Sequence, residues 1–450
     1  MATLDRWRTF LVTPQTLAFP HLKLIGRDGA PPIVVGSGEI RMPSLDRFEF
    51  TLKGLPRDVG YAFSEIQRQR RNRYDGRERF RLRGADLKGA QWSMGWVTLG
   101  QVEPGNDIWT FVGETDGLFP HCASDAVASE SCTELVFFLP INHPMARSML
   151  RFVLAEQPEG RPRKEHVLET LGSTIRFAYD PSLSALSITA MHSAGLPPTY
   201  TENWLGEPLR ILFGQLIFPR LVARNLGNGR THVDVRRCPG LIGSTARLAA
   251  FWRGDDLGQD KEDFWQRYTE LLTVIARAGN FEAHKITHLY EEVIQAARGT
   301  RWTWAMTFAS CIEGLANILE PPGRDRSDAD ADAVADLVKY INAWPGDGRL
   351  KHNAVNAVQR TLKTTTIIGL RQLVSVGAIT TTQLKAWEEI RHSVMHGSLI
   401  SPYSSEEENN KLLALAEMMH ALTLEILQRS NLHSPTGPNS DDGASEADAD

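Results

Sequence analysis

The segment TTTQLKAWEEIRHSVMHG, residues 380–397, decides how the C-terminal part of the chain folds. Thr380 followed by Gln383 matches a capping box, in which each side chain bonds to the other residue's backbone, so a helix should begin here. Gly397 is a typical residue just after a helix end. At 100° per residue one face of this helix is apolar. Its members are Leu384, Trp387, Ile390, Val394 and Met395.

Arg391 falls in the middle of this apolar face, and His392 and His396 lie along its edge. Burying an arginine costs several kcal/mol unless the charge is paired. The pattern therefore predicts that Arg391 either meets a carboxylate in the core or borders a polar cleft or a partner.

Arg391 and His396 form an Arg-x4-His pattern within the run Arg-His-Ser-Val-Met-His-Gly. One more apolar helix follows it, Lys411 to Leu427, and the helical segment Ile312–Leu319 upstream carries Glu313. In these features residues 300–430 resemble the HEPN family, many of whose members are metal-independent ribonucleases. The family's frequent motif has asparagine at the position of His392.

The resemblance implies an endoribonuclease without metal or other cofactor. Arg391, His396 and His392 would be the catalytic residues, and Glu313 would support them. Histidine suits proton transfer near neutral pH, and arginine gives a phosphate two charge-assisted hydrogen bonds. The RNA 2′-hydroxyl would attack the adjacent phosphate in a composite site formed by a homodimer, with tRNA as one candidate substrate.

Two other interpretations stay open. Many HEPN domains are non-catalytic binding or dimerisation modules, in which Arg391 would be a buried ion-pair partner of Glu313 or Glu388. His284 and His288, four apart on an expected helix, have a spacing that suits one metal ion, although no third ligand is evident. A packed or solvated helix face is the simpler interpretation of these two histidines.

The chain as a whole reads as α+β, with a β-rich N-terminal region followed by an all-α, HEPN-like helical bundle. We expect a β-rich sensor or substrate region over 1–245, a helical connector over 246–299, the HEPN-like domain over 300–432 and a disordered acidic tail over 433–450. Beyond the first helix, which contains Phe264 to Ile275, the further helices are expected at about 281–298, 303–319, 331–343, 352–376, 381–396 and 409–429.

The N-terminal half shows alternating patterns typical of strands. Phe48, Phe50 and Leu52 should share one strand face, and Trp92, Met94 and Trp96 should share another. Asn228-Gly229 between two apolar runs predicts a hairpin. One helix is expected, from Pro208 to Leu221.

The two-part layout, and the segment Asn203–Phe213, are similar in character to ApeA-type anti-phage proteins. That resemblance implies a role in abortive infection and a phage-derived trigger as a partner.

Residues 67–83 hold eight of the 38 arginines of the chain. Arg79, Arg81 and Arg83 should share a strand face opposite Phe80 and Leu82, and such a face could follow a phosphate backbone. A solvated charged surface is the simpler alternative. The candidate RNA-binding residues are Arg68, Arg70, Arg71, Arg73, Arg79, Arg81 and Arg83.

Composition narrows the class of protein. The net charge is −5, yet residues 433–450 contribute five acidic residues and no lysine or arginine, so the rest of the chain is neutral. Four cysteines without a Cys-x-x-Cys pair exclude a disulfide scaffold or a zinc ribbon. The first ten residues lack an apolar signal core, and no apolar run reaches membrane-spanning length. We therefore expect a cytoplasmic protein that is not embedded in a membrane.

Overall fold

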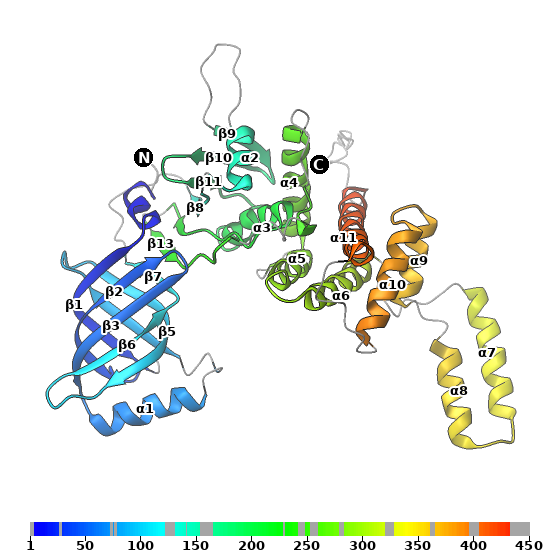
Figure 1. The fold of residues 1–450 in the computed structure, drawn as a ribbon, viewed down its shortest axis with the longest axis horizontal. Helices are drawn as coiled ribbons and strands as arrows, with labels where there is room; N and C mark the ends of the chain where they lie inside the picture. Colours follow the sequence, from blue (N-terminus) through cyan, green and yellow to red (C-terminus); the bar gives the residue numbers. More distant parts are fainter. Residues whose placement is uncertain are drawn as a thin grey trace, which may run out of the picture. The chain divides into compact units, whose positions relative to one another are not determined.

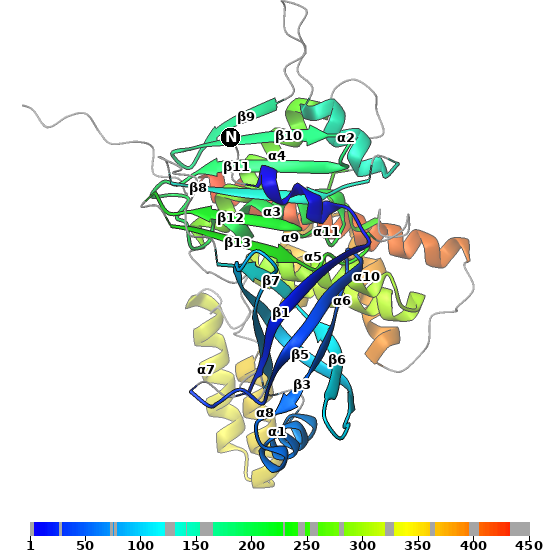
Figure 2. The same cartoon turned by 90° about the vertical axis from the view of Figure 1, so that its left-hand side faces the viewer.

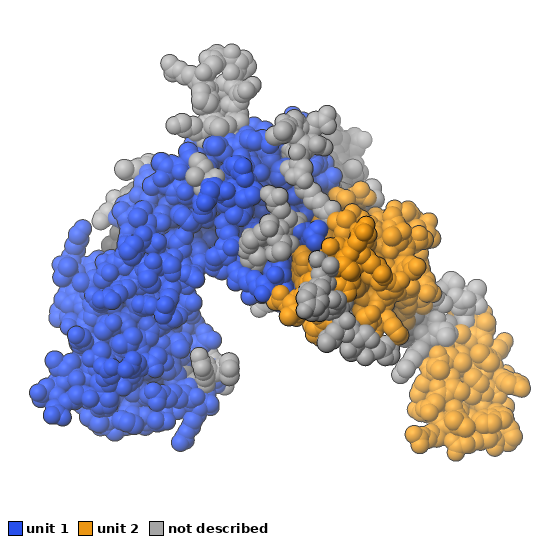
Figure 3. All heavy atoms as spheres, in the orientation of Figure 1, with its two compact units in different colours: residues 1–298 blue, residues 299–450 orange. Residues whose placement is uncertain are grey.

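A computed structural model of the chain describes residues 4–26, 29–72, 75, 79–121, 131–140, 142–153, 165–227, 230–241, 248–252, 260–278, 283–319, 328–360, 365–395 and 405–432. They fall into two compact units, residues 1–298 and 299–450 (Figure 3). As expected, the first is rich in strands and the second is helical. The expected tail, 433–450, lies outside the described residues.

The first unit begins with a closed six-stranded barrel of antiparallel strands (Figure 1). Its strands are β1 (Gln15–Ile25), β2 (Val34–Ser44), β3 (Arg47–Pro56), β4 (Phe80–Ala85), β5 (Gln91–Glu103) and β6 (Trp109–Thr115). The barrel is closed because β4 pairs with both β1 and β5. A helix that the sequence pattern did not reveal, α1 (Val59–Arg71), connects β3 to β4.

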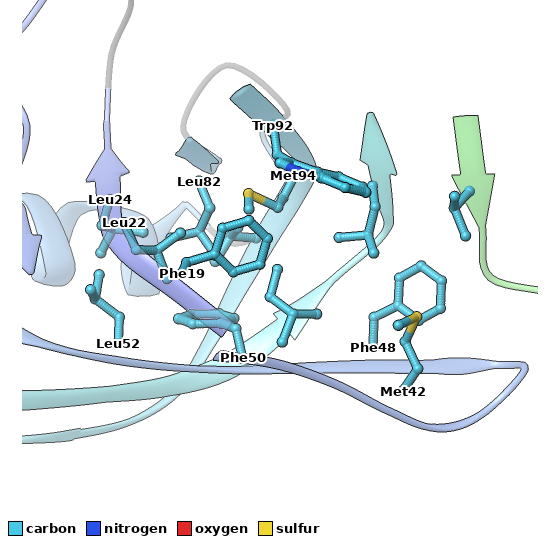
Figure 4. Packing of buried hydrophobic residues seen from close by; sticks show 14 of the residues in the cluster. Phe19, Leu22, Leu24, Met42, Phe48, Phe50, Leu52, Leu82, Trp92 and Met94 are labelled. Carbon is cyan, nitrogen blue, oxygen red and sulfur yellow. The ribbon is translucent and has the colours of Figure 1, made fainter. Parts of the chain in front are cut away.

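The barrel core follows the predicted alternation. Phe48, Phe50 and Leu52 are all buried, and they point into the same cluster as Leu22 and Leu82 from neighbouring strands (Figure 4). Period-2 burial of this kind fixes the strand register, because a slip by one residue would expose the whole set.

The prediction for Trp92, Met94 and Trp96 is correct for the first two residues and wrong for Trp96. Trp92 and Met94 are buried, but Trp96 is 37% exposed. The register explains the difference: Arg81 pairs with Trp96 and Leu82 pairs with Met94, so Gly95 is an extra residue on β5. This β-bulge turns the next side chain to the outer face.

A seven-stranded antiparallel sheet continues from the barrel, because β7 pairs with both β5 and β13 (Figure 2). Its order is β7 (Gly117–Pro120), β13 (Thr231–Arg236), β12 (Leu221–Asn225), β8 (Cys132–Phe138), β11 (Ala185–Met191), β10 (Ser173–Asp180) and β9 (Glu165–Thr170). The β12–β13 pairing confirms the expected hairpin, whose residues 228–229 lie outside the described residues.

Five helical segments accompany this sheet, η1 (Asp5–Leu11), α2 (Pro144–Val153), α3 (Thr201–Phe213), α4 (Asp260–Arg277) and α5 (Lys285–Ala296). The expected helix from Pro208 to Leu221 is corrected to α3, which begins seven residues earlier and contains Pro208. Every residue of α3 except Asn203 is buried, so the helix shows no amphipathic period from which its start could be read. Helices α4 and α5 pack on α3, so the expected connector belongs to the first unit.

Arg220 joins the barrel to the second sheet. Its side chain is fully buried and donates from Nε to the Phe10 carbonyl at 3.1 Å and from Nη1 to the Leu45 carbonyl at 3.0 Å and the Arg236 carbonyl at 2.6 Å. The guanidinium also lies 4.5 Å from the centre of the Phe48 ring. Burial lowers the pKa of Arg220 to about 10, so it stays charged at neutral pH.

We predict that Arg220→Met destabilises the first unit by about 3 kcal/mol or more, because each buried carbonyl left without a donor costs about 1–3 kcal/mol. Urea denaturation followed by tryptophan fluorescence measures the loss. Arg176→Met is the control, since Arg176 is exposed and its ion pair with Glu165 spans 3.8 Å. A loss below about 1 kcal/mol for Arg220→Met would show that other contacts hold the junction.

In its described residues, the second unit has four helices that pack on one another and a further helical pair. Helix α6 (Arg301–Leu319) contacts α9 (Thr366–Ser375), α10 (Thr381–Met395) and α11 (Glu406–Leu432). Helix α7 (Asp328–Ala343) packs on α8 (Gly348–Arg360). The single helix expected over 352–376 is therefore two helices, α8 and α9. In the described part of the chain, no helix is long and apolar enough to cross a bilayer.

Candidate functional site

Helix α10 begins where the sequence predicts. The Thr380 backbone N–H donates to Gln383 Oε1 at 2.8 Å, and the Gln383 backbone N–H donates to Thr380 Oγ1 at 3.2 Å. These reciprocal bonds confirm the capping box and satisfy two backbone donors at the helix start.

The apolar face of α10 packs into the second unit. Leu384, Trp387 and Ile390 are buried. Trp387 Nε1 donates to the Ala309 carbonyl of α6 at 3.0 Å, which fixes the rotation of α10 against α6. The predicted apolar stripe is thus confirmed for these three residues, whereas the side chains of Val394 and Met395 are outside the described set.

Arg391 lies one turn after Trp387 and reaches solvent. Its Nε is 3.4 Å from Oε2 of Glu313, which lies one turn after Ala309. The exposed fractions of the two side chains are 47% and 37%. The guanidinium carbon is 5.5 Å from the centre of the Trp387 ring. The arginine stem therefore covers apolar surface while its charged end stays in water, which explains how an arginine fits on this face.

These residues line an open pocket of about 510 Å³ in the second unit. Its wall includes Glu313, Thr365, Thr366, Trp387, Arg391 and His392. Among the described lining residues, the charged or titratable side chains are the Arg391 guanidinium, the carboxylates of Glu313 and Glu388, and the His392 imidazole. Of the expected site residues, Arg391, His392 and Glu313 come together here, whereas His396 lies outside the described residues.

The described arginines of residues 67–83 come from two elements, α1 and β4, with Arg79 directly before β4. Arg68 is largely buried on α1 and pairs with Glu65 at 2.6 Å, whereas Arg70 and Arg71 are exposed at the end of that helix. Arg73 lies outside the described residues. The expectation for the last three arginines is confirmed in part: Phe80 and Leu82 point into the barrel core, and Arg81 and Arg83 are on its outer face, with Arg79 just before the strand.

The sequence pattern did not reveal which residues lie beside Arg81 and Arg83. A second pocket, of about 650 Å³, lies on the outer face of the barrel and includes His21, Lys23, Arg81, Arg83 and Gln91. Lys23 and Arg83 are paired across β1 and β4, 60 residues apart in sequence. Only the strand register brings them together, and no local pattern predicts that register.

The expectation that His284 and His288 lie on one helix is wrong for His284, which precedes α5. Helix α5 begins at Lys285, and His284 is its N-cap, with Nδ1 accepting from the Ile286 backbone N–H at 3.1 Å. Burial, with a smaller effect of His288, lowers the pKa of His284 to about 4. Among the described residues, no cluster of three or more histidine, cysteine or acidic side chains could hold a metal ion.

Comparisons with known proteins do not identify a family for this chain. No family model matches the sequence, and searches of curated proteins and of solved structures give no match. The candidate function therefore rests on the sequence motif and on the geometry of the pocket.

We predict that Arg391→Ala lowers the melting temperature of the second unit by less than about 4 °C, because an exposed ion pair contributes at most about 1 kcal/mol. Trp387→Ala should cost about 3–5 kcal/mol, because it removes a buried ring and the bond to Ala309. Differential scanning fluorimetry of both variants measures the contrast. A large loss for Arg391→Ala would support a structural role for this arginine.

We also predict that His284 makes the first unit sensitive to acid. Its folded pKa is depressed, so the unfolded state binds the proton more readily. The stability that depends on neutral His284 is complete above pH 6.5. As the pH falls toward 4, the free energy of unfolding decreases by up to about 1.4 kcal/mol per pH unit. In His284→Asn, which keeps a capping oxygen, melting temperature should fall less steeply between pH 7 and 4.5. Parallel curves for both proteins would contradict this.

Proposed function

We propose that the second unit is a metal-independent endoribonuclease of the HEPN type. The observation that carries the proposal is the placement of Arg391: a half-exposed guanidinium beside His392 in an open pocket, near the end of α10 and five residues before His396 in the sequence. The packed helices α6, α9, α10 and α11 agree with a helical bundle of this kind.

The proposed reaction uses the RNA as its own nucleophile. A base removes the proton of a 2′-hydroxyl, and the oxygen attacks the adjacent phosphorus. An acid protonates the 5′-oxygen as it leaves, and a 2′,3′-cyclic phosphate remains. His396 is the proposed acid–base residue, since the ordinary histidine pKa of about 6.5 lies near working pH.

Arg391 would stabilise the negative charge that develops on the phosphate oxygens. A planar guanidinium can donate two hydrogen bonds to a phosphate and remains charged. In the present structure it faces Glu313 at 3.4 Å, a separation at which an exposed pair is weak. Glu313 would hold the guanidinium in place until a phosphate replaces it, and His392 would orient the phosphate or its neighbour.

One protomer offers a single Arg391 and a single His396, and five residues of an ideal helix would separate such a pair by about 140° around the axis. A two-fold homodimer would bring two such sets to one cleft, because an isologous interface repeats every residue. We therefore include a homodimer in the proposal, with the composite site between its copies.

The biological role that we propose is anti-phage defence by abortive infection in the cytoplasm, with tRNA as one candidate substrate and a phage-derived trigger sensed by the first unit. The support is the succession of a strand-rich unit and a helical unit that carries the motif. A nuclease of this kind must be weakly active until triggered.

The alternative is a binding or dimerisation module of the same family without catalysis. The Arg391–Glu313 ion pair favours this alternative, because the guanidinium already has a carboxylate partner. The exposure of both groups weakens that interpretation, since a structural pair is expected to be buried.

We predict that purified wild-type protein in EDTA cleaves RNA and leaves 2′,3′-cyclic phosphate ends. Arg391→Ala and His396→Ala should each lower the cleavage rate at least about a hundredfold, because each removes a group that acts in the transition state. A tRNA pool and total RNA serve as substrates, and phage protection in cells is scored with the same variants.

Arg349→Ala is the matched control, since it removes an exposed arginine from α8 in the same unit. Equal cleavage by all four proteins would contradict the assignment of the site. RNA or partner binding without cleavage, together with phage protection that survives Arg391→Ala, would favour the binding module.

A further inference from the structure

The helical pair α7 and α8 carries exposed apolar residues that the proposed nuclease site does not use. The two helices pack side by side (Figure 1), and the short turn 344–347 joins them, so they run antiparallel. In their described parts, 331–343 and 348–359, no residue is buried. Two helices of this length without a buried core are only marginally stable in water. The pair would therefore gain stability from a surface that covers it.

The exposed apolar residues of α7 form a seam beside its contact with α8. Val334, Val338 and Ile341 are half-buried, which marks the side of α7 that faces α8. A quarter turn away, at spacing i, i+4, i+7 and i+11, lie Ala333, Leu337, Tyr340 and Trp344. Large apolar residues at this spacing are typical of a helix face that packs on a partner, yet the Tyr340 side chain is 77% exposed.

Helix α8 carries a second seam, formed by Leu350, Ala354 and Ala357 at spacing i, i+4 and i+7. The Leu350 side chain is 58% exposed, whereas Val355 and Val358 are half-buried and mark the side that faces α7. On both helices the seam is displaced from the contact side in the same rotational sense. Because the helices are antiparallel, this rotation brings the two seams to one side of the pair. We call this side the α7–α8 apolar face.

The two seams differ in size in a way that fits a second copy of the chain. The seam of α7 has three large side chains, whereas the seam of α8 has two alanines. Stacking two such faces about a two-fold axis parallel to the helices places α7 on α8 of the partner. Leu337 then lies opposite Ala354 of the partner subunit, and Ala333 lies opposite Ala357 of the partner subunit. Large side chains thus meet small ones, as tight packing requires.

The charges of the two helices favour the same arrangement. Helix α7 has four aspartates and one lysine, a net charge of −3, and α8 has three basic residues and no acidic one, a net charge of +3. Placing α7 on α8 of the partner brings opposite charges together, whereas α7 on α7 would oppose like charges. Because −3 and +3 cancel, the two helices attract a second copy better than they attract a nucleic acid or an anionic membrane.

We propose that the α7–α8 apolar face is an interface between two copies of this chain, in which two helical pairs form an antiparallel four-helix bundle. The interface uses neither Arg391 nor His396, so it does not require the chain to cleave RNA. In the proposed nuclease it would hold the homodimer together through residues other than those of the pocket.

Disulfide cross-linking between two single-cysteine variants of the full chain tests the register of this interface. Ala333→Cys and Ala357→Cys should form a linked dimer when the two proteins are mixed and oxidised, because these positions meet across the interface. Neither variant alone should exceed the wild type, since its two new thiols would lie on diagonal helices, beyond the Cα separation of about 7 Å that a disulfide spans. The described native cysteines are buried.

Leu337→Asp, added to both cysteine variants, should lower the yield of the mixed cross-link at least about fivefold, because it places a carboxylate in the apolar interface. Asn342→Asp is the matched control: it adds the same charge to an exposed position of α7, about 140° around the helix from Leu337, and should leave the yield unchanged. Circular dichroism checks that both variants keep their helix content.

A mixed cross-link no stronger than that of either variant alone would overturn the proposal. A mixed cross-link that Leu337→Asp leaves unchanged would overturn it as well. The experiment contains no RNA, so its outcome is independent of whether the second unit is a nuclease.

Discussion

The hydrogen bond from Trp387 Nε1 to the Ala309 carbonyl is the contact on which the candidate site depends. It fixes the rotation of α10 on α6. The residues one turn further along the two helices, Arg391 and Glu313, then face each other at the pocket. A buried ring and its bond contribute several kcal/mol, whereas the exposed ion pair contributes at most about 1 kcal/mol. Trp387 therefore provides most of the stability of this region, and Arg391 is left available for a ligand.

In the first unit, too, the residues that stabilise the fold differ from those that carry charge on the surface. The inward residues of β1 and β4 form an apolar core, and Arg220 ties the barrel to the second sheet through three carbonyl groups. The outward residues of the same strands include Lys23, Arg81 and Arg83. Alternation along a strand allows this division, because substitutions on one face leave the other unchanged.

Local signals in the sequence predicted what local interactions decide. The capping box at Thr380, the alternation at Phe48–Leu52 and the β12–β13 hairpin all follow from contacts between near neighbours. The start of α3, the outward turn of Trp96 and the pairing of Lys23 with Arg83 depend on burial, a bulge and strand register. These are set by distant parts of the chain. The motif located Arg391 and His392, and Glu313 and Glu388 were both candidate partners of Arg391. Packing of α10 on α6 decides between them: Glu313 faces Arg391, whereas Glu388 pairs with Arg371 at 3.4 Å.

The central claim is that the Arg391 guanidinium acts on RNA and does not hold the fold. The most direct test is chemical rescue of Arg391→Ala in EDTA by guanidinium ion at concentrations well below those that unfold the protein. The pocket is open, so the small cation can enter the space that the side chain leaves. The account predicts that guanidinium restores part of the cleavage to Arg391→Ala and none to His396→Ala. Absence of rescue in a folded Arg391→Ala protein, or equal stimulation of both variants, would contradict it.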